Sequence, residues 1–123
     1  MRVLEIAFSC YPSKDIPRSL AFYEGVLGLK KTMDHATENG HWVEFDIGTG
    51  TLGLGKMEGW DASPMGCTVG LEVEDFDQAV AAVKAANVPI TMGPMETPVC
   101  HMLMISDPDG SPLIIHKRKP GHA

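Results

Sequence analysis

Hydrophobic and polar side chains alternate along several short segments of this chain. The first such run covers residues 3–11, where Leu4, Ile6, Phe8 and Cys10 fall on one face. An alternation with a period of two is typical of a half-buried β-strand. The chain therefore opens with a predicted strand.

The next segment has the spacing of a helix. Leu20, Tyr23 and Leu27 recur at intervals of three and four residues, which places them on one helical stripe. Asp15 is a good N-cap before this stripe, and Gly28 supplies a C-terminal stop. Three further runs, separated by Asn-Gly and Gly-Thr-Gly turns, predict strands at 29–36, 41–47 and 51–57.

The same order of elements then recurs after a connecting segment at 58–66, which is rich in Gly and Pro. A strand at 68–74, a helix capped by Asp75, and strands at 90–97, 100–106 and 112–118 are predicted. Matching residues recur 60 positions apart: Asp15 and Asp75, Thr37 and Thr97, His41 and His101, Gly50 and Gly110, Leu54 and Ile114. The shared shift and element order predict one domain over residues 1–123, built from two repeat modules at about 1–57 and 67–118.

Composition and charge narrow the classes of partner. The 123 residues include 10 Lys and Arg against 16 Asp and Glu, a net charge of −6, which disfavours nucleic acid as a partner. No apolar run approaches the roughly 20 residues of a membrane span, and the acidic Glu5 interrupts any apolar signal segment. The three cysteines form no C-x-x-C pair and favour a reducing compartment. We therefore expect a cytoplasmic protein without nucleic-acid or membrane partners.

Two motifs carry a resemblance to a known family. The first is Asp15 followed by Arg-Ser-Leu-Ala-Phe-Tyr at 18–23 and Leu-Gly-Leu at 27–29, and the second is Asp-Pro-Asp-Gly at 107–110 before the last predicted strand. With the repeat, these motifs resemble the vicinal oxygen chelate superfamily of glyoxalases, bleomycin resistance proteins and extradiol dioxygenases. The resemblance implies an α+β fold in which two tandem βαβββ modules form a half-open mixed β-cup with the helices outside. It also implies a homodimer.

Alternation sorts the strand residues of this fold onto two faces. The side expected to face the helices carries Val43, Phe45, Ile47, Val69, Leu71, Val73, Leu103, Ile105, Leu113 and Ile115. The side expected to face the cavity carries Trp42, Glu44, Asp46, Leu52, Leu54, Lys56, Thr68, Glu72, Met102, Met104, Ile114 and His116. Each strand is assigned as a set, because a slip of one residue would invert all of its side chains.

The first strand allows two registers. An ungapped repeat turns Phe8 and Cys10 toward the cavity but leaves Glu5 on the helix side. An indel of about three residues, or a bulge, would instead turn Glu5 inward. We favour the ungapped register.

The family resemblance also implies where a metal would bind. Members with metal chemistry hold a divalent ion with inward side chains of the first and last strands of each module, and these places correspond here to Phe8, Leu54, Thr68 and Ile114. Because a catalytic site needs about three protein ligands, we expect no metal at the standard position and no cofactor. A divalent metal at a displaced site, held by His116 with inward carboxylates, stays open as an alternative.

The cavity-facing residues indicate a function in binding. The expected ligand-binding residues are Phe8, Trp42, Glu44, Leu54, Thr68, Glu72, Met102, Met104, Ile114 and His116. A mostly apolar wall with a few carboxylates suits a small organic molecule, and the acidic charge favours a cationic one. If the protein is an enzyme, the resemblance implies a metal-dependent lyase or dioxygenase, and Glu44, Glu72 and His116 are the candidate acid–base groups. A third alternative is an interaction module without a ligand.

Overall fold

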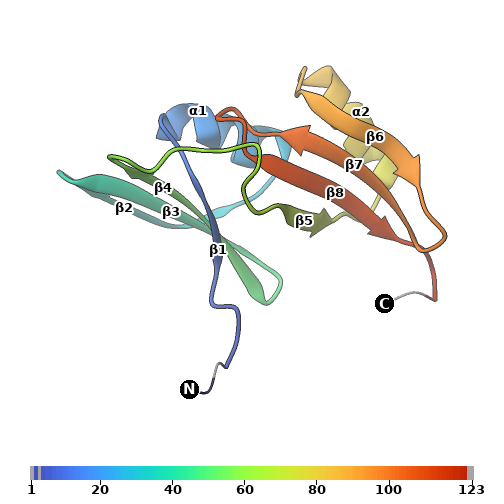
Figure 1. Cartoon of the computed structure of the whole chain (residues 1–123), viewed down its shortest axis with the longest axis horizontal. Coiled ribbons are helices and arrows are strands. Elements are labelled where there is room, and N and C mark those ends of the chain that lie inside the picture. Colours follow the sequence, from blue (N-terminus) through green and yellow to red (C-terminus); the bar gives the residue numbers. More distant parts are fainter. Residues whose placement is uncertain (1, 3, 122–123) are drawn as a thin grey trace. The chain divides into compact units, whose positions relative to one another are not determined.

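The computed structural model describes residue 2 and residues 4–121, and the chain divides into two compact units, Met1–Ala62 and Ser63–Ala123. Their boundary falls in the segment 58–66 that the sequence predicts as a connection. Each unit contains one mixed four-stranded sheet and one helical segment (Figure 1). This is the α+β, two-module glyoxalase-like architecture that the repeat and the motifs predict.

The two units share one topology. The first contains β1 (Ser9–Pro12), α1 (Ile16–Leu20), the π-helical segment η1 (Ala21–Val26), β2 (Lys31–Thr37), β3 (Gly40–Ile47) and β4 (Gly50–Met57). The second contains β5 (Val69–Glu72), α2 (Phe76–Ala85), β6 (Ile90–Glu96), β7 (Cys100–Ser106) and β8 (Pro112–Arg118). The strand orders are β1-β4-β3-β2 and β5-β8-β7-β6, in which the first strand of each unit runs parallel to the last and the other pairs are antiparallel.

The repeat is also visible in hydrogen bonds. The side chains of Asp15 and Asp75 each accept a bond of 3.0 Å from the backbone N–H three residues later and so cap their helices. Thr37 and Thr97 each donate from Oγ1 to a carbonyl three residues later, both at 3.3 Å. Equivalent side chains thus make equivalent local bonds, which supports the repeat independently of the element order.

Two predicted elements differ from the structure. Val3, where the first predicted strand begins, lies outside the described residues, and the observed strand is only Ser9–Pro12. Leu4 and Ile6 are 80% and 87% exposed, because no neighbouring strand of the described chain pairs with them. The first helix is α-helical only to Leu20 and then widens into the π-helical η1.

A hydrophobic core lies between each helix and one face of its sheet. In the first unit, Tyr23 is fully buried on η1 and stacks on Phe45 of β3 with ring centroids 5.9 Å apart. In the second unit, the buried side chains come from α2, β7 and β8: Val83, Leu103, Ile105, Leu113 and Ile115. The predicted helix-side faces of β3, β7 and β8 are confirmed.

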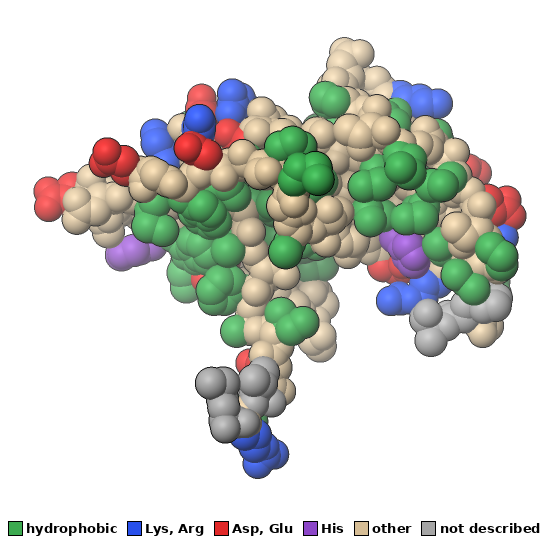
Figure 2. Space-filling view, in the orientation of Figure 1, with side chains coloured by type: hydrophobic (Ala, Val, Ile, Leu, Met, Phe, Trp, Pro, Cys, Tyr) green, Lys and Arg blue, Asp and Glu red, His purple; other side chains and the backbone are tan. Residues whose placement is uncertain are grey.

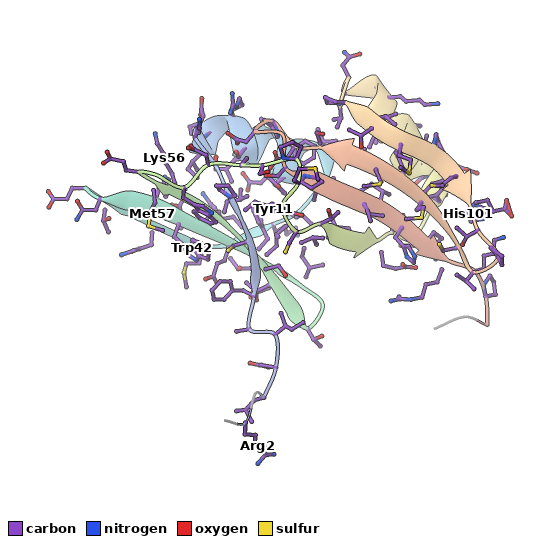
Figure 3. The ribbon with its side chains drawn as sticks, in the orientation of Figure 1. Arg2, Tyr11, Trp42, Lys56, Met57 and His101 are labelled. Carbon is purple, nitrogen blue, oxygen red and sulfur yellow. The ribbon has the colours of Figure 1, made fainter. Side chains whose placement is uncertain are left out.

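The predicted phase of β4 is wrong by one residue. Leu52 and Leu54 pair with Phe45 and Val43 and are buried with them, so they do not lie on the cavity-facing side. Lys56 shares their phase, and Figure 3 shows it on the other side of the sheet from Trp42 and Met57. The side chains of this strand therefore face opposite to the prediction.

A difference in turn length explains the error. Four residues lie between the paired Asp46 and Thr51, whereas five lie between the equivalent pair, Ser106 and Pro112. As a result, residues in equivalent positions of β3 and β7 are 60 apart in the sequence, whereas those of β4 and β8 are 61 apart. Because side chains alternate along a strand, this one residue exchanges the two faces of β4 relative to the ungapped repeat.

The buried position of Leu54 predicts a stability effect. Leu54→Ala should lower the free energy of unfolding by about 2–5 kcal/mol, because it leaves a cavity in the core of the first unit. Met57→Ala, on the same strand but 56% exposed, should change it by about 0.5 kcal/mol or less. Chemical denaturation measures both, and equal effects would contradict the observed phase of β4.

Candidate functional site

In each unit the face of the sheet opposite the helix, here termed the open face, carries the candidate functional side chains. The open face of the first unit includes Phe8, Cys10, Met33, His35, Trp42, Glu44, Asp46, Gly53, Gly55 and Met57. Figure 2 shows hydrophobic side chains gathered beneath the β2–β4 sheet. The strand pairs fix this set, since directly opposite residues point to the same side of a sheet.

Two glycines of β4 provide the room for a tryptophan. A Cβ atom at Gly53 would lie 2.5 Å from Cζ2 of Trp42, and one at Gly55 would lie 3.1 Å from Cε3 of the same ring. Trp60, just after β4, reaches the same place, with its Cζ3 atom 2.5 Å from the Cβ position at Gly55. The indole of Trp42 therefore rests directly on the backbone of β4.

A carboxylate and a second aromatic ring hold Trp42. Its indole Nε1–H donates a hydrogen bond of 2.6 Å to Oε2 of Glu44, two residues along β3. The ring of Phe8 contacts the indole edge-on, with centroids 5.6 Å apart. Trp42, Met57 and Gly55 also line a shallow pocket of about 220 Å³. An aromatic surface and a carboxylate are thus placed side by side.

The contact of Phe8 with Trp42 supports the ungapped register of the first strand. Cys10 pairs with Gly53, and it lies on the open face together with Phe8. Glu5 is exposed and precedes β1, so it does not turn toward this face as part of a strand.

The open face of the second unit is rich in methionine. Its residues come from all four strands: Gly70, Glu72, Met92, Met95, Met102, Met104, Ile114 and His116. The predicted phases of β5, β7 and β8 are confirmed by these pairs. Thr68, predicted to lie on the same face, is exposed and precedes β5 by one residue.

Glu72 and His116 form a hydrogen-bonded polar pair on this face. His116 Nδ1 lies 2.6 Å from Oε1 of Glu72, and Oε2 accepts a bond of 2.7 Å from the backbone N–H of Arg118. Desolvation by itself would raise the pKa of Glu72, but the hydrogen bonds from Arg118 and His116 outweigh it and hold this pKa below the usual range. The carboxylate is therefore ionised at neutral pH and fixes the orientation of the imidazole.

The three candidate acid–base residues are divided between the two units. Glu72 and His116 contact each other in the second unit, and Glu44 bonds to Trp42 in the first. Leu54, expected to bind a ligand, lies instead in the hydrophobic core because of the phase of β4.

The standard metal positions of the fold do not fit a divalent ion. The observed register makes Gly53, and not Leu54, the residue of the first unit that is equivalent to Ile114. The reason is that Cys10 pairs with Gly53 in the first unit, and the equivalent Gly70 pairs with Ile114 in the second. Neither Gly53 nor Ile114 has a donor atom, and Phe8 has none either, which leaves only the hydroxyl of Thr68. Within residues 4–121, no three His, Cys, Asp or Glu side chains are grouped closely enough to hold a metal ion.

Trp60 and the β4 glycines were not anticipated as parts of a site. Trp60 falls in the segment predicted as a connection, and no spacing ties it to the strands. The alternating glycines of Thr-Leu-Gly-Leu-Gly at 51–55 do carry a signal, since glycine inside a strand often marks the close approach of another group.

Comparison with known proteins identifies the family. The model of the Glyoxalase/Bleomycin resistance protein/Dioxygenase superfamily matches residues 5–115. The chain belongs to this superfamily. No curated protein matches it.

Solved structures of superfamily type share the fold. A glyoxalase/bleomycin resistance protein/dioxygenase domain from Frankia sp. EAN1pec is 16% identical, with a TM-score of 0.81 over 98% of this chain and 96% of that one. Glyoxalase I of Leishmania major is 21% identical, with a TM-score of 0.78 over 94% and 87%. A fosfomycin resistance protein of Listeria monocytogenes is 12% identical, with a TM-score of 0.78 over 97% of each chain. At these identities the likeness shows the fold alone.

Among the described residues, no helix of this superfamily member has the length and apolar character needed to cross a membrane.

The glycine support of Trp42 predicts a local effect of substitution. In a Trp60→Phe background, which leaves Trp42 as the sole tryptophan, Gly53→Ala should displace the indole and move its emission to longer wavelength. The added methyl group should cost about 1–3 kcal/mol of stability, as overpacking does. Gly70→Ala, a strand glycine with no atom within 4 Å of its Cβ position, is the matched control and should leave the emission unchanged. Unchanged emission in Gly53→Ala would contradict the contact.

Proposed function

We propose that the protein binds a small organic molecule, with preference for a positively charged one, and does so without a metal at the standard position of its superfamily. The observation that carries this proposal is the pairing of Trp42 with Glu44 on the open face of the first unit. A cation is attracted to the face of an indole and to a carboxylate, and here the hydrogen bond from Trp42 to Glu44 holds these two groups side by side.

The surroundings of Trp42 support an organic ligand. Phe8 and Met57 extend the apolar surface, and the pocket of about 220 Å³ beside Trp42 has a polar group in His35. A mostly apolar lining with a few polar groups is typical of small-molecule sites.

The open face of the second unit offers a candidate ligand surface of its own. Met102, Met104 and Ile114 form an adaptable apolar surface beside the bonded pair Glu72 and His116. If the protein also transforms its ligand, we propose His116 as the acid–base group, because Glu72 orients its imidazole as carboxylates do in catalytic pairs.

Glu44 provides the sharpest test of the charge preference. Binding is followed by thermal shift and by quenching of tryptophan emission, with a panel of aromatic amines and quaternary ammonium compounds and their anionic counterparts of similar size. We expect cationic members to bind, and Glu44→Gln to weaken their binding by about tenfold or more, or about 1.4 kcal/mol.

Asp46→Asn is the matched control. Asp46 lies two residues from Glu44 on β3, but its carboxylate accepts a bond from Thr51 rather than from the indole. This substitution removes the same charge and should change affinity little. An equal loss in both variants, or a preference for the anionic compounds, would contradict a site at Trp42 and Glu44.

A second candidate is a metal-dependent lyase or dioxygenase with a displaced metal site. It is favoured by the imidazole of His116 and its bond to Glu72, and by the structural likeness to a glyoxalase I. His116 and Glu72 supply two ligands at most, whereas a catalytic metal site usually has three protein ligands.

Metal content tests this second candidate. It predicts about one divalent transition-metal ion per chain in the purified protein, lost in His116→Ala, and turnover of the methylglyoxal–glutathione adduct on addition of Ni(II) or Zn(II). Neither property is expected if the protein binds its ligand without a metal.

We propose from the family resemblance that two chains pair as a homodimer. The cysteine content supports the further proposal that the protein acts in the cytoplasm.

A further inference from the structure

A row of side chains with sulfur, nitrogen and oxygen donor atoms crosses the open face of the second unit. Met95 of β6 pairs with Met102 of β7, Met102 pairs with His116 of β8, and His116 pairs with Glu72 of β5. Directly opposite residues of antiparallel strands have Cβ atoms about 4.5–5.5 Å apart and point to the same side. Two thioethers and an imidazole are therefore immediate neighbours.

Two further thioethers lie in the adjacent row. Met92 pairs with Met104, which is two residues from Met102 on the same face of β7. The register of β6 shifts between Met92 and Met95, so both pair with open-face residues although they are three positions apart. Figure 3 shows sulfur-tipped side chains over β6 and β7.

The imidazole of this row is prepared for coordination. An ionised carboxylate only accepts hydrogen bonds, so the 2.6 Å contact with Glu72 places a proton on Nδ1 of His116. The lone pair of the neutral ring then lies on Nε2. The other oxygen of Glu72 is held by the backbone N–H of Arg118, which fixes the carboxylate itself. Such a carboxylate–histidine pair orients many metal ligands.

The donor set indicates the class of metal. Thioether sulfur is a soft ligand that selects Cu(I), whereas Mg, Ca and Mn prefer oxygen donors. Two thioethers and a neutral imidazole carry no charge, and Glu72 supplies one negative charge beside them, which it shares with the guanidinium of Arg118 at 3.7 Å from Oε1. Met92 and Met95 are 51% and 39% exposed, so an ion can reach the row from solvent.

We propose that Met95, Met102 and His116 bind a soft monovalent metal ion, Cu(I) or its mimic Ag(I), with Glu72 as the positioning residue. The site differs from the standard metal positions of the superfamily. It shares His116 and Glu72 with the displaced divalent site considered above but adds two thioethers, and it does not depend on an organic ligand at Trp42 and Glu44. No electron transfer is involved, since the ion binds and leaves as a monovalent cation.

Titration with Ag(I) tests this site. The full-length protein carries Cys10→Ser and Cys67→Ser, because both thiols are exposed and would compete for the ion, whereas Cys100 is buried. Binding is followed by competition with a soft-metal chelator and by the methyl resonances of ¹³C-methionine. We expect one equivalent to bind and to shift the methyl groups of Met95 and Met102 and the ring protons of His116.

Three variants locate the site. Glu72→Gln should weaken Ag(I) binding by about 10–100-fold, as loss of a group that orients a ligand does, and Met102→Leu by at least as much. If Met102→Leu fails to fold, Met95→Leu provides the same test, because Met95 is 39% exposed and its substitution should also weaken Ag(I) binding. Met65→Leu, at a methionine that is 91% exposed and outside the strands, is the matched control and should bind as the parent does.

Several outcomes would overturn the proposal. These are methyl resonances of Met95 and Met102 that do not move, equal shifts at all eight methionines, or Zn(II) bound as tightly as Ag(I). Loss of all Ag(I) binding in the Cys10→Ser, Cys67→Ser protein would assign the ion to the thiols instead. Cu(I) under anaerobic conditions should reproduce the Ag(I) result.

Discussion

The packing of a helical segment against one face of each sheet is the constraint on which both candidate sites depend. Burial of Phe45 against Tyr23, and of Leu103 and Ile115 in the second unit, fixes which side of β3, β7 and β8 faces the hydrophobic core. Since side chains alternate, the same burial also fixes which residues lie on the open face. Trp42 and Glu44 lie there because Val43 and Phe45 are buried.

The two open faces have different chemistry on the same topology. In the first unit an aromatic ring lies against backbone and is bonded to a carboxylate. In the second unit the corresponding room is filled by Ile114 and His116, beside flexible thioethers. The first surface suits planar or cationic organic molecules, and the second suits soft ligands and ions. Membership of the superfamily does not decide between these, because its members share a fold rather than one chemistry.

Most of the fold can be predicted from the sequence, because periodicity, caps and turns are local. Asp15 and Asp75 cap their helices as expected, and the strands after them appear where alternation places them. The phase of β4 could not be predicted, since it depends on how many residues a turn contributes to the pairing. Leu4 and Ile6 alternate like strand residues, but a strand also requires a neighbour, which alternation does not reveal.

The site was predictable in part for the same reason. Residues whose phase is set by long apolar alternation, such as Met102 and His116, were placed on the correct face. Contacts made by side chains that cross between strands, such as Trp42 over Gly53, or that come from a connecting segment, such as Trp60, have no periodic signal.

The single residue by which the two turns differ, together with the side chains around it, limits how this chain can be engineered. Where β4 presents Gly53, β8 presents the branched side chain of Ile114, so β7 has no room for an indole that lies flat on its neighbour as Trp42 of β3 does. The two modules are therefore not interchangeable. A chain assembled from two copies of the first module would have two aromatic faces and no methionine row, whereas deleting one residue from the 107–111 turn would invert β8 and bury its histidine.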